Sequence, residues 1–145
     1  MSEYLPVETS SAEEKLLREA IETVAQELGF QAEIHEQGRE SHLHGYVGDQ
    51  RQQTAQFIVR RRHVGAVSND IGWTRQEDGS YKLLISRYDQ RSCANARQIT
   101  EHVDIEYKRR LVERQVKRSV RFRGAKVQTT RTSTGAVQLQ IVMRG

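Results

Sequence analysis

The stretch "SNDIGWTRQEDGSYKLLISRYD", residues 68–89, predicts a β-hairpin at the centre of the fold. Ile71 and Trp73 are two residues apart, so in a strand they share one face and pack inward. The strand-like runs "DIGWTRQ" and "SYKLLISRY" flank Asp78-Gly79, a dipeptide that is a strong hairpin-turn signal. We therefore expect two antiparallel strands here, with their aromatic and aliphatic side chains in the core.

Asp70 stands directly before this apolar pair and falls on the opposite face of the strand. Its carboxylate is expected to accept backbone N–H bonds in the turn from Val67 to Asn69, or to pair with an arginine. Gly72 is expected to allow a bulge or a close neighbour. For the motif as a whole, a structural role is favoured over a chemical one; its residues are Asp70, Ile71, Gly72 and Trp73.

Two helices are predicted from apolar residues at helical spacing. The first begins near Ser11, whose Ser-x-x-Glu spacing is that of a capping box, and ends at Gly29, with Phe30 folding back onto its last turn. The second runs from Asn95 to about Val120. Their apolar stripes contain Leu17, Ala20, Ile21 and Val24 in the first helix, and Ile99, Val103, Tyr107 and Leu111 in the second.

Short alternating runs predict the remaining strands: "FQAEIHE", "HLHGYVG", "TAQFIVRRR" and a last hairpin after Gly124 that turns near residues 133–135. The expected fold class is α+β, an antiparallel sheet of four or five strands with two main helices packed on one face. The order helix, glycine, strand, turn, strand occurs at both ends of the chain and suggests a degenerate repeat of helix plus β-hairpin. Residues 1–10 are expected to be a flexible segment, and residues 11–145 a single α+β domain.

Composition narrows the function classes. The single cysteine, Cys93, allows no disulfide within a monomer, which favours a reducing, cytoplasmic location. There is no signal-peptide pattern and no run of 18 apolar residues, so no membrane association is expected. The glycine-rich nucleotide-binding motifs are absent, and no cofactor is expected.

Charge is unevenly distributed along the 145 residues. Residues 1–50 contain eleven acidic and three basic residues, whereas residues 51–145 contain twenty basic and eight acidic ones. Such asymmetry indicates either an anionic partner for the basic part or folding of the acidic part against it. The predicted basic surface comprises Arg60, Arg61, Arg62, Lys108, Arg109, Arg110, Arg114, Lys117, Arg118 and Arg121.

The basic surface leads to two functional hypotheses. The first is a non-catalytic adaptor or assembly factor that binds an acidic protein partner through its Arg-rich helix, because arginine forks suit carboxylates. The alternative is a sequence-tolerant RNA- or DNA-binding protein that acts through counterion release, although no recognised nucleic-acid module is present. A third idea is a thiol- or metal-dependent enzyme. It rests on Cys93 near a helix start or on the cluster of His35, His42 and His44, and in both cases an ordinary structural role is favoured.

The order of these pieces from about Leu17 onward resembles the uncharacterised hypothetical chloroplast reading frame thirty-five family, also called domain of unknown function twelve fifty-seven. The family has an Asp-Trp pair after the central hairpin, where this chain has Ser86-Arg87-Tyr88. The resemblance implies a fold and no established activity. It is carried by Gly29-Phe30, Gly45-Tyr46, Ala55–Arg60, Asp70-Ile71-Gly72-Trp73, Asp78-Gly79, Tyr81, Leu83, Leu84, Gly135, Val137, Leu139 and Val142, together with the basic helix.

Overall fold

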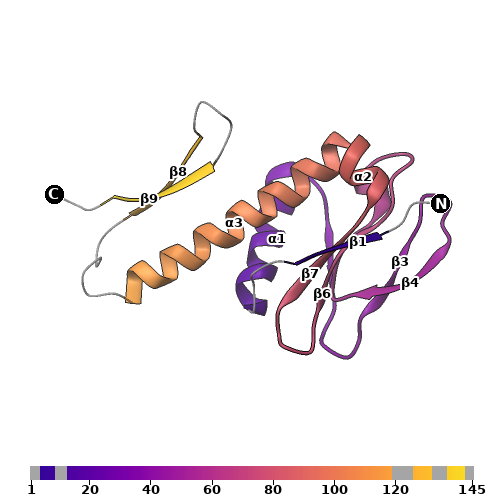
Figure 1. Cartoon of the computed structure of the whole chain (residues 1–145), viewed down its shortest axis with the longest axis horizontal. Helices are drawn as coiled ribbons and strands as arrows, with labels where there is room; N and C mark the ends of the chain where they lie inside the picture. The colour runs from indigo at the N-terminus through magenta and orange to yellow at the C-terminus, as the bar shows by residue number, and fades with distance from the viewer. Residues whose placement is uncertain (1–3, 9–12, 119–125, 132–136, 143–145) are drawn as a thin grey trace.

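The computed structural model describes residues 4–8, 13–118, 126–131 and 137–142, and these residues form an α+β fold. A five-stranded antiparallel sheet lies at its centre, with two main helices on one face and a short β-hairpin on the other (Figure 1). The expected fold class, an antiparallel sheet with two main helices packed on one face, is confirmed.

The central sheet has the strand order β1-β7-β6-β5-β2, and every neighbouring pair is antiparallel. Gly79 takes the left-handed conformation, with φ of 87°, at the predicted turn between β6 and β7. The strands of this sheet are β1 (Tyr4–Glu8), β2 (Ala32–Ile34), β5 (Phe57–Val59), β6 (Ile71–Arg75) and β7 (Tyr81–Ser86).

The two main helices, α1 (Glu14–Leu28) and α3 (Ala94–Arg118), lie close to their predicted positions. Gly29 ends α1 with φ of 79°, and its N–H donates to the Ala25 carbonyl. The N-cap of α1 is Glu13, which forms no side-chain cap bond, while Ser11 lies outside the described residues. Two short elements complete this part of the chain: η1 (Arg61–His63) lies between β5 and β6, and α2 (Arg87–Ser92) connects β7 to α3.

Strand alternation gives the sheet two apolar faces with different partners. On the helix side, Ile71 and Trp73 are buried against α1 and α3, as their spacing predicts. On the opposite side, Ile58 and Leu84 are buried against a hairpin of β3 (Ser41–His44) and β4 (Gln50–Ala55), which crosses the sheet. The sheet is therefore the middle one of three layers.

Gly72 provides the close approach that lets the hairpin lie on the sheet. A Cβ atom at this position would lie 2.6 Å from the Ala55 Cβ and 3.0 Å from the Leu43 Cδ2. The Ala55 Cβ is fixed to its backbone, so a contact this short requires the hairpin or β6 to move. Of the two expectations for Gly72, a bulge or a close neighbour, the structure shows the close neighbour.

Two details differ from the sequence-based expectations, and a third agrees with them. Residues 1–10 were expected to be flexible, but Tyr4–Glu8 forms β1, which pairs with β7 along its whole length because it completes an open sheet edge. The strands β2 and β3 do not pair with each other, so α1 is not followed by a hairpin of the kind that follows α3. The closing hairpin itself is present as β8 (Lys126–Arg131) and β9 (Val137–Val142), and its turn lies outside the described residues.

Within residues 4–8, 13–118, 126–131 and 137–142, no helix combines the length and the apolar character needed to cross a bilayer.

We expect the substitution Gly72→Ala to lower the free energy of unfolding by about 1–3 kcal/mol, because the added methyl group overpacks the sheet–hairpin interface. Urea unfolding followed by circular dichroism measures the change. The double variant Gly72→Ala/Ala55→Gly removes the methyl group that the new one meets, and it should recover part of the loss. An unchanged midpoint for Gly72→Ala would show that the hairpin does not lie this close to β6.

Candidate functional site

The carboxylate of Asp70 is completely buried at the start of β6, between the sheet and the β3–β4 hairpin. It accepts hydrogen bonds from the backbone N–H of His44 at 2.6 Å and of Arg61 at 2.7 Å, and from the Arg60 Nη1 at 2.7 Å. The Asp70 N–H donates to the His44 carbonyl at 3.0 Å, and the Tyr4 hydroxyl donates to the Asp70 carbonyl at 2.7 Å. Asp70 therefore joins three segments of the chain.

Arg60 is the ionic partner of Asp70, and it also reaches the edge of the sheet. Its guanidinium donates to both carboxylate oxygens of Glu33 on β2, and to the His42 carbonyl and the Ser41 hydroxyl on β3. The hydrogen bonds to Glu33, together with those to Asp70, raise the pKa of Arg60 although burial opposes this. The same Arg60 bond holds the pKa of Glu33 below its ordinary value, against the effect of burial.

The predicted roles of these residues are partly confirmed. Asp70 pairs with an arginine, as expected, but its backbone donors come from His44 and Arg61 and not from the turn at residues 67–69. The N–H of Asn69 is already bonded to Asp89 Oδ2 at 2.9 Å, which is the physical reason. Arg60 was assigned to an exposed basic surface, but its side chain is only 16% exposed and is paired with two carboxylates.

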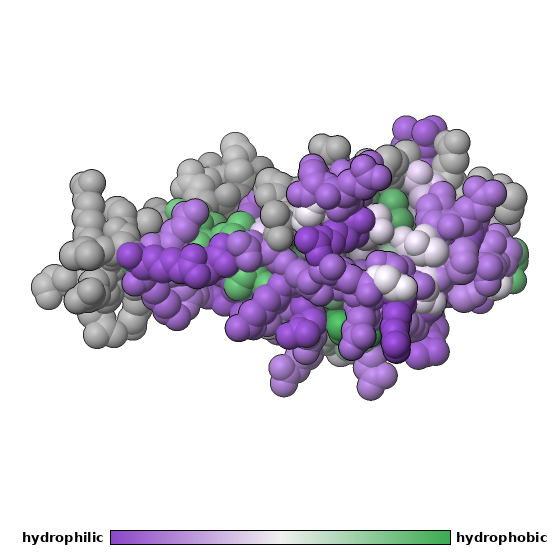
Figure 2. Space-filling view, turned by 90° about the horizontal axis from the view of Figure 1, so that it is seen from below, coloured by the Kyte–Doolittle hydropathy of each residue, from purple (hydrophilic) through white to green (hydrophobic). Residues whose placement is uncertain are grey.

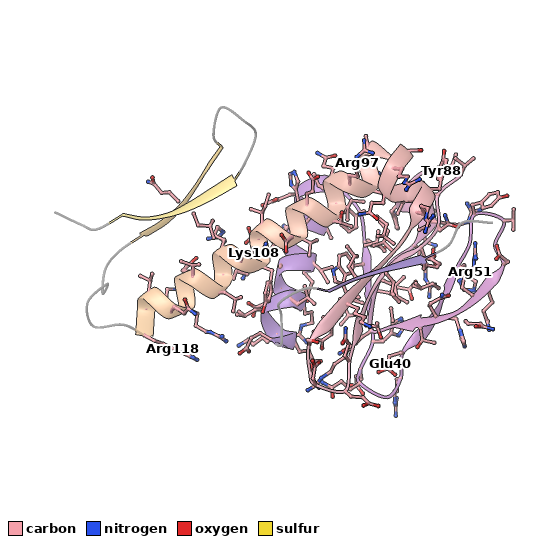
Figure 3. The ribbon with its side chains drawn as sticks, in the orientation of Figure 1. Glu40, Arg51, Tyr88, Arg97, Lys108 and Arg118 are labelled. Atoms are coloured by element: carbon pink, nitrogen blue, oxygen red, sulfur yellow. The ribbon has the colours of Figure 1, made fainter. Side chains whose placement is uncertain are left out.

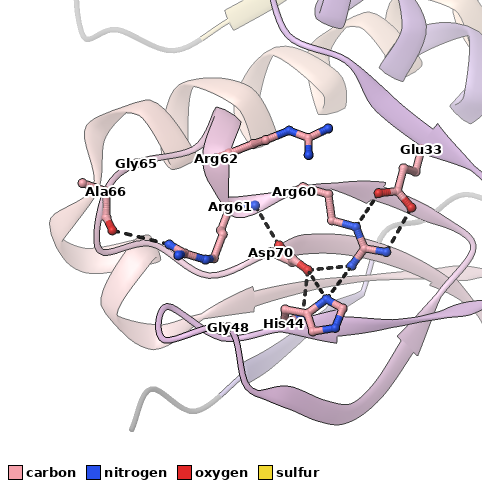
Figure 4. Close-up of a pocket in the computed structure, with 9 residues that line it drawn as sticks. All are labelled: Glu33, His44, Gly48, Arg60, Arg61, Arg62, Gly65, Ala66 and Asp70. Carbon is pink, nitrogen blue, oxygen red and sulfur yellow. Dashed lines mark hydrogen bonds and ion pairs between the residues drawn. The ribbon is translucent and has the colours of Figure 1, made fainter.

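A hollow of about 860 Å³ opens beside this ion pair. Figure 4 shows the Arg60 side chain directed into the network of Asp70 and Glu33, while Arg61 points toward Ala66 and Arg62 points the other way. The loop before β4 and the loop after η1 form its rim. The lining residues are Glu33, His44, Gly48, Arg60, Arg61, Arg62, Gly65, Ala66 and Asp70.

The charges around the hollow do not cancel. Glu33 and Asp70 are both hydrogen-bonded to Arg60, so their acceptor capacity is largely used within the chain. Among the described residues, neither Arg61 nor Arg62 has a carboxylate within 4 Å. The Arg61 Nη1 reaches only the Ala66 carbonyl, at 3.5 Å, and Arg62 is exposed. The hollow therefore presents two guanidinium groups that are available to an anion.

The arginines of α3 are in a different situation, because the chain supplies their counter-ions. Arg110 donates to Glu19 and Thr23 of α1, at 3.2 and 2.8 Å. Arg114 donates to Glu13 at 3.0 Å. Ion pairs along the helix add Arg109 with Glu106 and Glu113, Lys108 with Asp104, and Lys117 with Glu113.

The expected basic ridge on α3 is thus largely neutralised by glutamates of α1 and of α3 itself. Among the described residues Arg118 has no carboxylate within 4 Å, and Arg121 lies outside the described residues. Burial raises the pKa of Glu106, but the bonds and charges of Arg109 and Arg110 outweigh burial and hold this pKa below its ordinary value. The lowered pKa agrees with tight pairing. In Figure 2, hydrophilic side chains cover most of the face that includes this helix.

The two basic clusters do not form one surface. Asn95, near the start of α3, donates to the Val64 carbonyl next to η1, so Arg61 and Arg62 lie at the beginning of the helix. Arg118 lies at the opposite end, about 35 Å away at 1.5 Å per residue. Figure 3 shows this separation, with Arg97, Lys108 and Arg118 spaced along α3. A small anionic group can contact one cluster only.

Among the described residues, the groups behind the enzyme hypotheses, the Cys93 thiol and the histidine cluster, do not come together in one site. Cys93 contacts the Ser68 hydroxyl at 3.5 Å and the Val64 carbonyl at 3.9 Å, and no imidazole of the described residues is hydrogen-bonded to its thiol. A β-bulge separates His42 from His44, which bond to the Arg51 carbonyl and to Arg60. The part of the chain that the structure describes contains no group of three or more potential metal ligands.

Sequence reasoning missed Glu33, Ser41 and His44 as partners of the buried ion pair. Each lies on β2 or β3, and only the placement of the β3–β4 hairpin across the sheet brings them to Arg60. One signal was present: a carboxylate before an inward-facing pair on a strand, with a run of three arginines ten residues earlier.

Comparisons with protein-family models, with curated proteins and with solved structures return no match to this chain. The resemblance to the reading frame thirty-five family therefore stays a prediction.

We expect Asp70→Asn to lower the free energy of unfolding by about 3 kcal/mol. The amide keeps the size of the side chain but loses its charge, and its NH₂ group cannot accept the N–H bonds that the carboxylate accepts. The substitution also leaves the largely buried Arg60 with only one of its two counter-ions, Glu33. Urea unfolding measures the loss. Asp78→Asn, at the exposed β6–β7 turn, is the matched control and should change stability by less than about 1 kcal/mol. Equal effects for the two variants would contradict a structural role for the ion pair.

Acid should weaken the fold partly through Glu33. Its pKa is lowered from an ordinary value of 4.5, so its contribution is present above that pH and is lost as the pH falls through the lower folded-state value. Glu33→Gln should therefore reduce the loss of unfolding free energy between pH 5 and pH 3, without abolishing it, because the pKa values of Glu13 and Glu106 are lowered too. Glu36→Gln, at an exposed site, is the control. Identical pH profiles for wild type and Glu33→Gln would refute the pairing.

Proposed function

We propose that the protein is a non-catalytic adaptor or assembly factor that binds an acidic segment of a partner protein, with the hollow at Arg61 and Arg62 as the centre of the contact. The observation that supports this most directly is the pair of neighbouring guanidinium groups that lack a carboxylate partner among the described residues, at the edge of an open hollow. Arginine binds carboxylates through paired N–H donors, which makes an acidic side chain a suitable ligand.

The hollow is a better docking centre than the basic helix α3. A carboxylate that approaches Arg109, Arg110 or Arg114 has to displace glutamates that already accept their hydrogen bonds. Such an exchange replaces one ion pair with another of similar strength, so its net gain in free energy is small. At Arg61 and Arg62 a partner carboxylate has no glutamate of the described residues to displace. It therefore adds charge-assisted hydrogen bonds that the free protein lacks.

The directions of the two side chains favour an extended ligand. Arg61 and Arg62 point to opposite sides of η1 in Figure 4, so in this conformation they cannot grip one compact anion from both sides. A peptide with several carboxylates can place one on each guanidinium. Nucleic acid is the alternative polyanion, but the α3 arginines are paired within the chain, and the unpaired Arg118 lies about 35 Å from Arg61 and Arg62. This leaves only a short unpaired basic track among the described residues.

The double substitution Arg61→Glu/Arg62→Glu should weaken binding of fluorescein-labelled octaglutamate by about tenfold or more at low ionic strength, because two attractive contacts become repulsive. The matched control is Lys117→Glu/Arg118→Glu, which inverts the same number of charges at the far end of α3. It should change the affinity by less than about threefold, since charges this distant are screened. Fluorescence anisotropy measures both affinities.

Two results would contradict the proposal. Equal weakening by both double variants would show that octaglutamate responds only to net charge. Tighter binding of a uridine homopolymer than of octaglutamate by the wild-type protein, with a steep dependence on salt concentration, would favour nucleic-acid binding instead.

A further inference from the structure

Exposed apolar side chains lie in the same two loops that line the hollow. Val47 is 66% exposed and Val67 is 55% exposed, and Tyr46 beside them is 39% exposed. Their chain neighbours Gly48 and Ala66 line the hollow that Arg61 and Arg62 also line. We call these three side chains, Tyr46, Val47 and Val67, the apolar rim.

The loops that carry the apolar rim are held in place by buried hydrogen bonds. The N–H of Tyr46 donates to the Asn69 Oδ1 at 3.0 Å, which ties one loop to the other. Asn69 is completely buried, and its side-chain amide donates to Ser86 at 3.0 Å and to Asp89 at 3.3 Å. Because these loops are already held in place, binding a ligand costs little free energy for ordering them.

We propose that the occupant of the hollow is a peptide segment in which an apolar side chain lies next to the carboxylates, with the carboxylates on Arg61 and Arg62 and the apolar side chain on Val47 and Val67. This inference rests on the proposed function and specifies the chemistry of its partner. Charge complementarity selects the acidic part, since Arg61 and Arg62 line the hollow together with Gly48 and Ala66, the chain neighbours of the two valines.

The character of the rim favours an aliphatic or aromatic peptide side chain over a nucleic-acid base. Val47 and Val67, the two most exposed large apolar residues among those described, are branched aliphatics without a ring for a base to stack on. Tyr46, the one aromatic residue of the rim, is less exposed than either valine. An apolar contact flanked by charged groups is also the usual composition of a protein–protein interface. Burial of one leucine side chain against such a rim should tighten binding about tenfold, which corresponds to about 1.4 kcal/mol.

The test compares two labelled peptides that carry the same number of glutamates. One is octaglutamate, and the other has one leucine inserted at its centre. The leucine peptide should bind the wild-type protein about tenfold more tightly than octaglutamate. In Val47→Ser/Val67→Ser this ratio should fall to about one, while the affinity for octaglutamate is retained.

Two further variants act as controls. Ile34→Ser removes another exposed apolar side chain, on β2 and outside both loops, and should leave the ratio unchanged. Arg61→Glu/Arg62→Glu should weaken both peptides. Circular dichroism confirms that each variant is folded before the affinities are compared.

The outcomes separate this inference from the proposed function. If the wild-type protein binds both peptides equally well, the apolar contact is refuted while the acidic docking site stands. If Val47→Ser/Val67→Ser keeps the preference for leucine, the apolar contact lies elsewhere and the assignment to the rim is wrong. If neither peptide binds, the proposed function fails, and this inference fails with it.

Discussion

The buried ion pair between Asp70 and Arg60 holds the layers of the structure together. Asp70 precedes β6 in the central sheet, and its carboxylate and backbone bond to His44 on the overlying hairpin. Arg60 extends the connection to Glu33 at the sheet edge and to the β3 backbone. A completely buried carboxylate is costly unless it is paired, so the hairpin can cover Asp70 stably only while Arg60 pairs with it. Gly72 allows the close approach that this pairing requires.

The same ion pair determines which cations remain available. Arg60 binds both carboxylates that line the hollow, and therefore its two successors in the chain, Arg61 and Arg62, have no local counter-ion among the described residues. On α3 the opposite holds, because glutamates three or four residues from the arginines, together with Glu13 and Glu19 of α1, pair with them. Two clusters of similar basicity in the sequence thus differ in what they can offer to a partner.

The sequence was sufficient for the elements with strong periodicity. The α1 stripe, the Gly29 cap and the β6–β7 hairpin follow from local spacing and turn chemistry, and all three are present. The hairpin across the second face was not foreseen, because β3 and β4 carry polar residues on one side and their packing depends on contacts with Ile58 and Leu84, remote in the chain. Arg60 is predicted at the surface for the same reason, because its partners Glu33 and Ser41 are remote from it in the chain. The sequence leaves open whether the α3 ridge is free or neutralised, because only the packing of the chain brings Glu19 to Arg110 and Glu13 to Arg114.

The most direct test is amide hydrogen exchange at His44 and Arg61, whose N–H groups donate to the buried Asp70 carboxylate at 2.6 and 2.7 Å. If Asp70 holds the hairpin on the sheet, both amides exchange only when the whole domain unfolds, with an opening free energy equal to that from denaturant unfolding. Exchange at His44 within seconds at neutral pH, while the amides of β6 and β7 stay protected, would show that the hairpin detaches freely. That result would contradict the central role of the ion pair and, with it, the hollow that the hairpin helps to form.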